Sequence, residues 1–387
     1  MTPGALAGVR VLDFSAMIAG PYCTSLLASL GAEVIKIEPP EGDYMRSRPP
    51  LRDGQSLYFA VLNAGKQSLA VDLKRPEGVA LVKSLVARAD VVVENFRPGV
   101  MRRLGLDYPA LSASRPGLVY CAISGYGQDG EFASQPAYAP IVHAASGYDL
   151  VNLAYQSGAE RPLNTGIFIA DFLTGVHAFG AVNAALVRRA RDGNGSLIDC
   201  ALMDAMVGML AYEVAEAQQP EPNPRLLYKA TRAKDGFFML SPISPANFEA
   251  MARACGHPEW ITDPRFAGSA RIRNWDALLA ELDRWATDKT VGECQAIMDA
   301  GGVPCARYQS VPEVMASPYA AARGLFADAT IGGVAFKAPR PPFRMAGEGS
   351  GHRVPALGED SRRIAAEVAG MSAAEVAAAV EQRILYG

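Results

Sequence analysis

Apolar residues in the first third of the chain form short, nearly continuous runs that alternate with segments of helical periodicity. The runs are residues 9–14, 33–38, 68–73, 90–94 and 118–124. Helical patterns fall between them at residues 21–30 and 76–89, and Pro76 occupies the favoured first position of the second helix. Apolar strands separated by helices are typical of a parallel sheet covered on both faces. The pattern therefore predicts an α/β fold.

The pattern changes after residue 150. Residues 170–191 predict one long helix with small residues at helical spacing, which would let another helix approach closely. A strand and helix are expected within residues 197–216, and the polar, Pro-containing residues 218–223 predict a linker. A separate module follows, with a strand at 236–241 and helices near 247–255, 275–287 and 291–300, and a final helix is expected at 373–384.

Composition narrows the class of protein. A chain of 387 residues, half apolar and one fifth charged, is typical of a globular protein with two domains. The net charge of -3 gives no general attraction to nucleic acid or to acidic membranes. Six separated cysteines and four scattered histidines form no metal motif and favour a reduced, cytoplasmic protein. The apolar segment 167–187 contains Asp171, His177 and Asn183, which favours a buried helix over a membrane span.

A glycine motif follows the last of the early strands. Gly125, Gly127 and Gly130 have the spacing of a dinucleotide-binding fingerprint. The glycines of that fingerprint open a helix beneath a pyrophosphate, whereas residues 131–140 contain two prolines and no helical period. The motif is therefore a weak indication of nicotinamide binding. A glycine loop that donates backbone N–H groups to an acyl oxygen is the reasonable alternative.

Asp171 is an acid among apolar neighbours at the start of the predicted long helix. Aspartate is a preferred N-cap, so one interpretation is structural. The other is a nucleophilic carboxylate, which the helix dipole holds ionised while water is kept away. The two interpretations are compatible with each other.

A basic cluster follows the predicted strand at 90–94. Arg97, Arg102 and Arg103 come directly after Asn95 and Phe96. Open α/β sheets bind ligands at the carboxyl ends of their strands, arginine suits phosphates, and an aromatic ring beside it can stack on a purine. A solvated turn explains the same residues equally well.

Many segments resemble, in one order along the chain, CoA-transferase family III, also called the CaiB/BaiF family. They are residues 6–14, 19–21, 30–38, 42–43, 63–78, 94–99, 124–127, 302–304 and 355–358. The resemblance implies a large Rossmann-like domain with a parallel sheet, built from residues 1–217 and 326–387. It also implies a smaller central α/β domain at residues 224–325, with linkers on either side, and a homodimer in which the two chains interlock.

The resemblance places the family's catalytic aspartate at Asp171. That residue is expected to attack an acyl-CoA thioester, forming an anhydride and then an aspartyl-CoA thioester, from which an acceptor carboxylic acid takes the CoA. CoA is then a substrate, and no permanently bound cofactor or metal is expected. The expected partners are the acyl-CoA, the acid and a second copy of the chain, without nucleic acid or membrane. Residues expected to bind CoA or substrate are Ile18, Val71, Lys74, Asn95, Phe96, Arg103, Gly125, Gly127 and Tyr138.

The sequence departs from two branches of the family. Ile18 stands where the formyl-CoA transferases carry a glutamine, Pro39 stands where they carry a CoA-contacting arginine, and their run of glycines is absent between residues 217 and 236. These differences argue against formyl or oxalate specificity. Tyr138 and Ser244 stand where the related α-methylacyl-CoA racemases carry the histidine and glutamate that move a proton. Racemisation is therefore not expected.

Two alternatives to CoA transfer stay open at this point. One is a racemase-like isomerase, since His143 lies in the same loop as Tyr138, although a structural role for this histidine is expected. The other is a protein that binds CoA without turnover. The donor and acceptor acids are not identified. A basic group in the central module would suit a second carboxylate, or would be surface charge, and consists of Lys229, Arg232 and Lys234.

Overall fold

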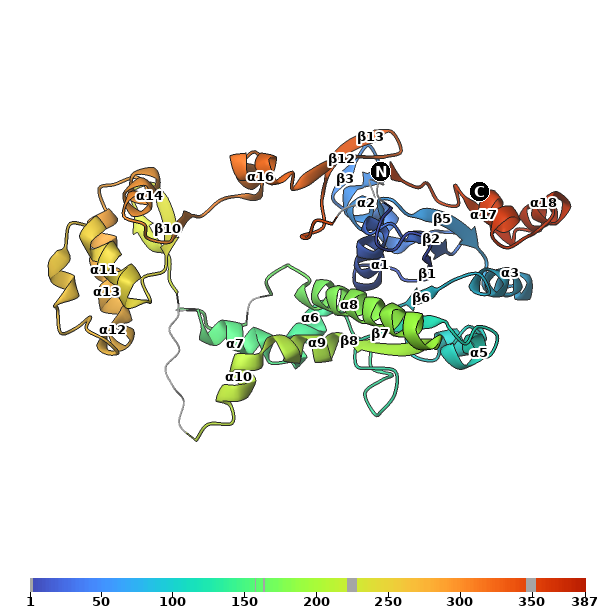
Figure 1. Ribbon diagram of the computed structural model, residues 1–387, viewed down its shortest axis with the longest axis horizontal. Coiled ribbons are helices and arrows are strands. Elements are labelled where there is room, and N and C mark those ends of the chain that lie inside the picture. Colours follow the sequence, from blue (N-terminus) through green and yellow to red (C-terminus); the bar gives the residue numbers. More distant parts are fainter. Residues whose placement is uncertain (1–2, 157, 163, 221–227, 346–352) are drawn as a thin grey trace. The chain divides into compact units, whose positions relative to one another are not determined.

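The computed structural model describes residues 3–156, 158–162, 164–220, 228–345 and 353–387 (Figure 1). These residues form two compact units. The large unit comprises Met1–Val214 and Gly324–Gly387, and the small unit comprises Ala215–Arg323. Residues 221–223 of the expected linker, and residues 224–227 at the start of the expected central domain, lie outside the described residues.

The large unit is built on a seven-stranded sheet of order β15-β5-β2-β1-β6-β7-β8. Six strands are parallel to their neighbours, and β15 runs antiparallel to β5 at one edge. The predicted α/β fold with a mainly parallel sheet is therefore confirmed. The strands are β1 (Arg10–Asp13), β2 (Glu33–Glu38), β5 (Gln67–Val71), β6 (Val91–Glu94), β7 (Val119–Ser124), β8 (Ser196–Ala201) and β15 (Leu385–Tyr386).

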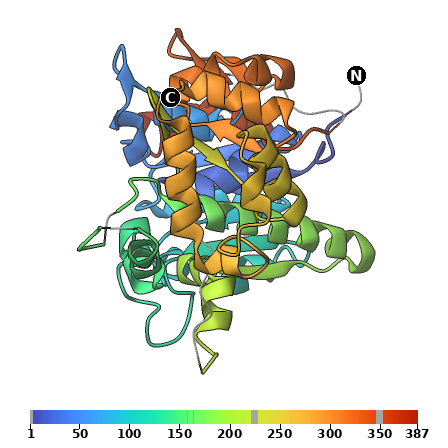
Figure 2. The same cartoon turned by 90° about the vertical axis from the view of Figure 1, so that its left-hand side faces the viewer.

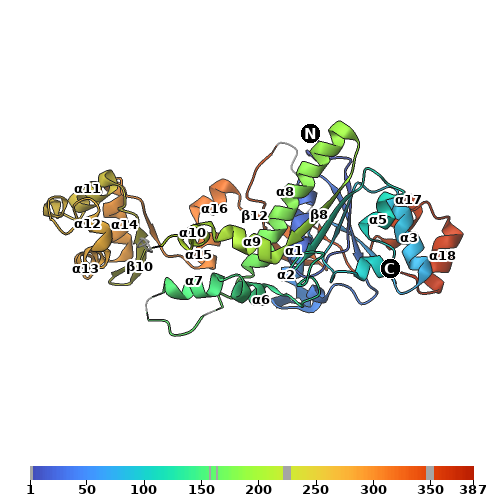
Figure 3. The same cartoon turned by 90° about the horizontal axis from the view of Figure 1, so that it is seen from below.

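Helices cover both faces of this sheet (Figure 3). Successive strand residues point to opposite faces, so Val11 of β1 joins the core under one helical layer while Leu12 joins the core under the other. The first layer contains α1 (Ala19–Ser29) and α8 (Ile169–Asp192), and the second contains α3 (Pro76–Val86), α5 (Tyr108–Ser112), α17 (Ser361–Glu367) and α18 (Ala373–Glu381).

The long helix α8 packs closely against α1. A Cβ atom at Gly175 would lie 2.7 Å from the backbone oxygen of Ala19, so a glycine is required for this approach. In the described part of the chain, α8 is the one helix long and apolar enough to cross a membrane. Its contacts with α1, β8 and α9 (Leu202–Met209) are those of a helix that covers a sheet.

A smaller layer beside the parallel sheet was not predicted from the sequence. Helix α2 (Leu57–Asn63) begins at Ser56, whose Oγ accepts a hydrogen bond from the Phe59 N–H at 3.1 Å. Its buried side chains share a core with Met45 and with the sheet β13-β12-β14. Further elements are β3 (Leu51–Arg52), β4 (Gln55–Ser56), β12 (Phe326–Ile331), β13 (Val334–Pro339), β14 (Arg353–Val354), η1 (Tyr44–Ser47), α4 (Val100–Arg103), α6 (Ala139–Ala145), α7 (Tyr148–Ala154) and α10 (Ala211–Glu216).

The small unit has its own core, formed by helices and a three-stranded antiparallel sheet of order β11-β10-β9 (Figure 2, yellow to orange). Ser244 caps its first helix, with Oγ accepting from the Asn247 N–H at 3.1 Å. Lys229 pairs with Asp276. The elements are β9 (Thr231–Ala233), β10 (Gly236–Leu240), β11 (Cys305–Arg307), α11 (Pro245–Ala254), η2 (Pro258–Ile261), α12 (Ala270–Arg273), α13 (Trp275–Ala286), α14 (Val291–Ala300), α15 (Val311–Met315) and α16 (Pro318–Arg323).

Candidate active site

The loop from β1 to α1 lies at the carboxyl end of the first strand and is tightly braced. The side chain of Asn95 holds Ala16 on both sides, because Oδ1 accepts from the Ala16 N–H at 2.8 Å and Nδ2 donates to the Ala16 carbonyl at 2.7 Å. Met17 has a φ of 66°, a left-handed conformation that few side chains other than glycine adopt. Such a conformation persists only where surrounding contacts fix it. Asn95 therefore fixes the backbone conformation of the β1–α1 loop, in addition to its expected role in binding CoA.

A buried network of charges lies against this loop. Lys66 Nζ is 2.9 Å from Asp13 Oδ2, and Lys36 Nζ is 2.9 Å from Asp43 Oδ2 and donates to the Ser15 carbonyl at 2.8 Å. Burial would raise the pKa of Asp13, but Lys66 and Lys36 outweigh it and lower that pKa to about 2. Burial lowers the pKa of Lys66 to about 8, against the attraction of Asp13. The network fixes the loop from beneath.

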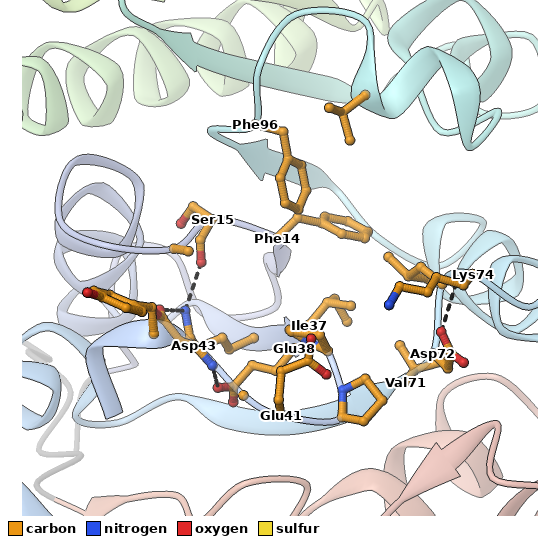
Figure 4. Close-up of a pocket in the computed structure, with 18 of the residues that line it drawn as sticks. Phe14, Ser15, Ile37, Glu38, Glu41, Asp43, Val71, Asp72, Lys74 and Phe96 are labelled. Atoms are coloured by element: carbon orange, nitrogen blue, oxygen red, sulfur yellow. Dashed lines mark hydrogen bonds and ion pairs between the residues drawn. The ribbon is translucent and has the colours of Figure 1, made fainter. Parts of the chain in front are cut away.

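A cavity of about 430 Å³ lies beside the carboxyl ends of β1, β2 and β5. Figure 4 shows the rings of Phe14 and Phe96 close together on its wall, with Val71 and Lys74 gathered at one end. Pro39, which was expected to stand where the formyl-CoA transferases carry an arginine, also lines the cavity. Three of the expected CoA-binding residues, Val71, Lys74 and Phe96, thus meet at one pocket.

The basic cluster after β6 has a looser relation to this cavity. Val100 and Leu104, which flank Arg103 on the α4 segment, line the cavity, whereas Arg103 is not among its lining residues. The guanidinium of Arg102 is exposed and lies 3.5 Å from Asp107. Arg97 lines a second cavity. The cluster therefore does not converge on one point in this structure.

The second cavity has a volume of about 270 Å³ and shares Ala16 and Phe96 with the first. It brings together residues from three loops, the first and last of which lie more than 100 positions apart in the sequence. Among them is Tyr138, a residue that is 62% exposed. Its lining includes Met17, Asn95, Ser124, Gly125 and Tyr138.

The glycine loop after β7 is shaped by close contacts. A Cβ atom at Gly125 would lie 2.2 Å from the Cβ of Ala137, and Gly127 has a φ of 92°. Beneath the loop, Asp199 accepts a hydrogen bond from the Gln128 N–H at 2.9 Å. No helix begins at Gly130, because the next one is α6 at Ala139, so the loop lacks the helix of a dinucleotide fingerprint. Gly125 lines the second cavity and Gly127 does not.

Asp171 lies in the first turn of α8, but the interpretation as a helix cap is wrong. The capping position is Phe168, and Asp171 is two residues inside the helix. Its carboxylate accepts a hydrogen bond from the backbone N–H of Ala19, the first residue of α1. Burial raises the pKa of Asp171 to about 6, and this hydrogen bond partly opposes the rise. The positive ends of two helix dipoles therefore meet at one sheltered carboxylate.

The structure adds Tyr58, which sequence reasoning missed. It lies in the first turn of α2, and burial together with the charge of Asp171 raises the pKa of its hydroxyl to about 12. The hydroxyl is therefore protonated near neutral pH and can donate a hydrogen bond. A capping serine before an apolar run at residues 57–62 was the available signal for this helix.

Ile18 is buried at the capping position of α1, next to Ala19, and lines neither cavity. Over the described ranges there is no group of three or more His, Cys, Asp or Glu side chains suited to a metal ion. Asp171 and Tyr58 are likewise not among the lining residues of either cavity.

The chain is similar over nearly its whole length to known CoA-transferases. The chain is 33% identical over 402 residues to succinyl-CoA–D-citramalate CoA-transferase of Chloroflexus aurantiacus, covering 99% of this chain and 98% of that protein. It is 32% identical over 380 residues to succinyl-CoA:glutarate CoA-transferase of Mus musculus, covering 94% and 86%. The chain is a CoA-transferase. A sequence model described as CoA-transferase family III matches residues 6–361, and the chain belongs to that family.

A solved structure is similar over nearly the whole chain. It is the crystal structure of a CaiB/BaiF family protein from Brucella suis, with 34% identity and a TM-score of 0.82. The similarity covers 95% of this chain and 100% of that one. The family resemblance expected from the sequence is confirmed.

Proposed function

We propose that this enzyme moves CoA from succinyl-CoA, or a closely related acyl-CoA, to a second carboxylic acid through covalent intermediates on Asp171. The relatives named above take succinyl-CoA as donor and use D-citramalate or glutarate as acceptor, which supports this substrate class. The single observation that carries the proposal is the environment of Asp171. It is a sheltered carboxylate at the start of two helices, with its pKa raised to about 6.

The reaction follows from that carboxylate. An oxygen of Asp171 attacks the thioester carbonyl, the carbon–sulfur bond breaks, and CoA leaves as its thiolate with an acyl-aspartyl anhydride remaining. The thiolate then attacks the aspartyl carbonyl, which releases the donor acid and leaves an aspartyl-CoA thioester. The acceptor carboxylate repeats these two steps in reverse order, so that acyl-CoA leaves and the carboxylate of Asp171 is restored. No atom is oxidised or reduced.

Two features of the site suit this chemistry. A carboxylate stripped of much of its hydration is a stronger nucleophile, and exclusion of water protects the anhydride from hydrolysis. Tyr58 stays protonated near neutral pH and is a candidate donor to the oxygen that gains charge when the thioester is attacked.

The two cavities, which share Ala16 and Phe96, suit the two ends of CoA. In the proposal the nucleotide occupies the larger cavity, with Phe96 as a stacking surface and Lys74 as a phosphate partner. The pantetheine and acyl group extend along Asn95 into the smaller cavity, beside Gly125 and Tyr138. The expected roles of Ile18, Val71, Arg103 and Gly127 belong to the same proposal.

An interlocked homodimer in the cytoplasm is also part of the proposal. Large apolar side chains remain exposed on α8, on the edge strand β8 and on α9, which is the surface that a second chain would cover. Examples are Val176, Val187, Leu197, Val207 and Met209.

Trapping the intermediate tests the proposal. The enzyme is incubated with succinyl-CoA and then treated with hydroxylamine or borohydride, and peptides are analysed by mass spectrometry. We expect a modification at Asp171 and a loss of CoA transfer to glutarate in Asp171→Ala. The matched control is Asp328→Ala, because Asp328 is an exposed carboxylate on β12. Full transfer activity in Asp171→Ala would rule out the covalent role.

A substrate screen then separates transfer from isomerisation. Succinyl-CoA, acetyl-CoA and other donors are tested against a panel of mono- and dicarboxylic acids. Transfer should need a free acceptor acid. Deuterium uptake at the α-carbon of an acyl-CoA without any acceptor would instead indicate a racemase-like reaction.

A further inference from the structure

His143 lies in α6 and is almost completely buried, with 1% of its surface exposed. Its Nε2 atom accepts a hydrogen bond from the backbone N–H of Ala170 at 3.1 Å. Ala170 is the second residue of α8 and directly precedes Asp171. The first N–H groups of a helix lack partners within the helix, and Phe168 makes no capping hydrogen bond. The imidazole therefore supplies an acceptor that the start of α8 would otherwise lack.

This contact determines the tautomer of His143. A neutral imidazole that accepts at Nε2 carries its proton on Nδ1. Nδ1 is buried and has no hydrogen-bond partner among the residues that the structure describes, and the same is true of Asp149 Oδ1 at the start of α7. Burial lowers the pKa of His143, and the charge of Asp149 opposes this change. A buried donor on His143 and a buried acceptor on Asp149 are thus both unsatisfied, and the charge of Asp149 acts on the imidazole.

We propose that His143, oriented by Asp149, is a positioning residue that holds the first turn of α8 and so keeps Asp171 at its reactive position. This inference rests on the proposed role of Asp171. Nε2 of the imidazole accepts the Ala170 N–H and is therefore not available to move a proton. This role differs from that of the acid–base histidine of a racemase. The ring of Tyr148 lies 5.4 Å from the imidazole and packs against it, which limits rotation of the ring.

Two substitutions at position 143 separate the hydrogen bond from the volume of the side chain. His143→Gln can place its amide oxygen where Nε2 accepts, whereas His143→Leu fills space and cannot accept. A small displacement of a reacting group costs up to about 100-fold in rate. We therefore expect kcat for CoA transfer to fall roughly 10- to 100-fold in the leucine variant, with KM for acyl-CoA little changed, and to fall less than about threefold in the glutamine variant.

Hydrogen exchange of the peptide covering residues 167–173 gives a readout independent of activity. The amide protons at the start of α8 should exchange faster in His143→Leu than in the wild type, and His143→Gln should restore the slow exchange. Unchanged kcat in the leucine variant, or an equal loss in both variants, would overturn the inference.

The tautomer is a second direct test. In ¹⁵N-histidine-labelled enzyme, the signals that disappear in His143→Gln identify this residue among the four histidines. We expect its proton on Nδ1 in the wild type and also in Asp149→Asn, because the Ala170 N–H still donates to Nε2. A proton on Nε2 in the wild type would contradict the geometry. If no adduct forms on Asp171, the proposed function fails, while exchange and tautomer still report on His143.

Discussion

Asp13 and Asp171 are both sheltered carboxylates of the large unit, but their surroundings differ. Asp13 is fully buried and meets Lys66, with Ser15 and Thr24 as further hydrogen-bond donors. Burial raises its pKa, and these partners more than reverse the rise, to about 2. Asp171 has the backbone N–H of Ala19 as its donor, and burial raises its pKa to about 6.

The comparison shows that burial alone does not set the pKa of an acid, because the groups around the carboxylate decide the direction of the shift. The oxygens of Asp13 are occupied by a lysine and two hydroxyl groups, which makes it a structural element that orders the β1–α1 loop. In the described part of the chain, no basic side chain contributes to the pKa shift of Asp171. Its charge is therefore poorly compensated, which favours sharing an electron pair with an electrophile.

The largest expected effect is at Asp171. Asp171→Asn should lower transfer by about 1,000-fold or more, because the nucleophile is lost.

The same change should stabilise the fold above pH 6. The native state binds more protons than the unfolded state between pH 4 and 6, so stability falls as pH rises through this window, by up to about 3 kcal/mol. Urea unfolding at pH 5 and pH 8 measures this, and a less stable variant at pH 8 would contradict it.

At Asp13 the opposite outcome is expected. Asp13→Asn should destabilise the fold by about 3–5 kcal/mol at pH 7, because Lys66 is left as an unpaired buried charge. The double variant Asp13→Leu with Lys66→Met should recover part of this loss. The pKa of Asp13 lies below its unfolded value of 3.8, so its contribution is complete above pH 4 and disappears as pH falls toward 2. Urea unfolding of the three proteins measures the effect.

The pH dependence of the reaction sharpens the difference. Only the ionised form of Asp171 can attack, so kcat/KM should fall below a midpoint near pH 6. Steady-state assays from pH 5 to 8 with one donor and one acceptor give this midpoint. No fall in kcat/KM down to pH 5 would mean that Asp171 is as well compensated as an ordinary surface acid.

The smallest expected effect is at Tyr58. Tyr58→Phe should lower kcat by about tenfold if the hydroxyl donates to the charge that develops on the substrate. Tyr22→Phe is the matched control, because the ring of Tyr22 packs against Phe172 and burial alone raises the pKa of its hydroxyl. Equal activity of both variants would remove Tyr58 from the proposed mechanism.

The sequence predicted the elements that carry long apolar runs. The strands of the parallel sheet and helices α1, α3 and α8 fall within a few residues of their expected positions, because burial on both faces leaves a strong pattern. The short elements α2, β12 and β13 were missed. The two strands alternate buried and exposed residues, but their buried residues are mostly alanines, which give a weak apolar signal. The edge strand β15 contains two residues, too few for any pattern.

The site was less predictable for a physical reason. The family resemblance assigned Val71, Lys74 and Phe96 to CoA binding, and all three lie at the edge of the parallel sheet where β5 and β6 end. The contact between Asp171 and Ala19 joins the starts of two helices about 150 residues apart, and no local pattern reports such a meeting. Likewise, no local pattern reports that Tyr58 lies near Asp171. The preference of aspartate for helix caps suggested Asp171 as the cap of α8, whereas the capping residue is Phe168.

The edge strand β15 has a consequence for synthesis of the protein on the ribosome. It completes the sheet beside β5, although more than 300 residues separate the two strands. At translation rates of roughly 5–20 residues per second, β5 waits about 15 to 60 seconds for this partner. During that interval the free edge of β5 can pair with strands of other nascent chains. Chaperones that shield exposed strands should therefore improve the yield of this enzyme in cells.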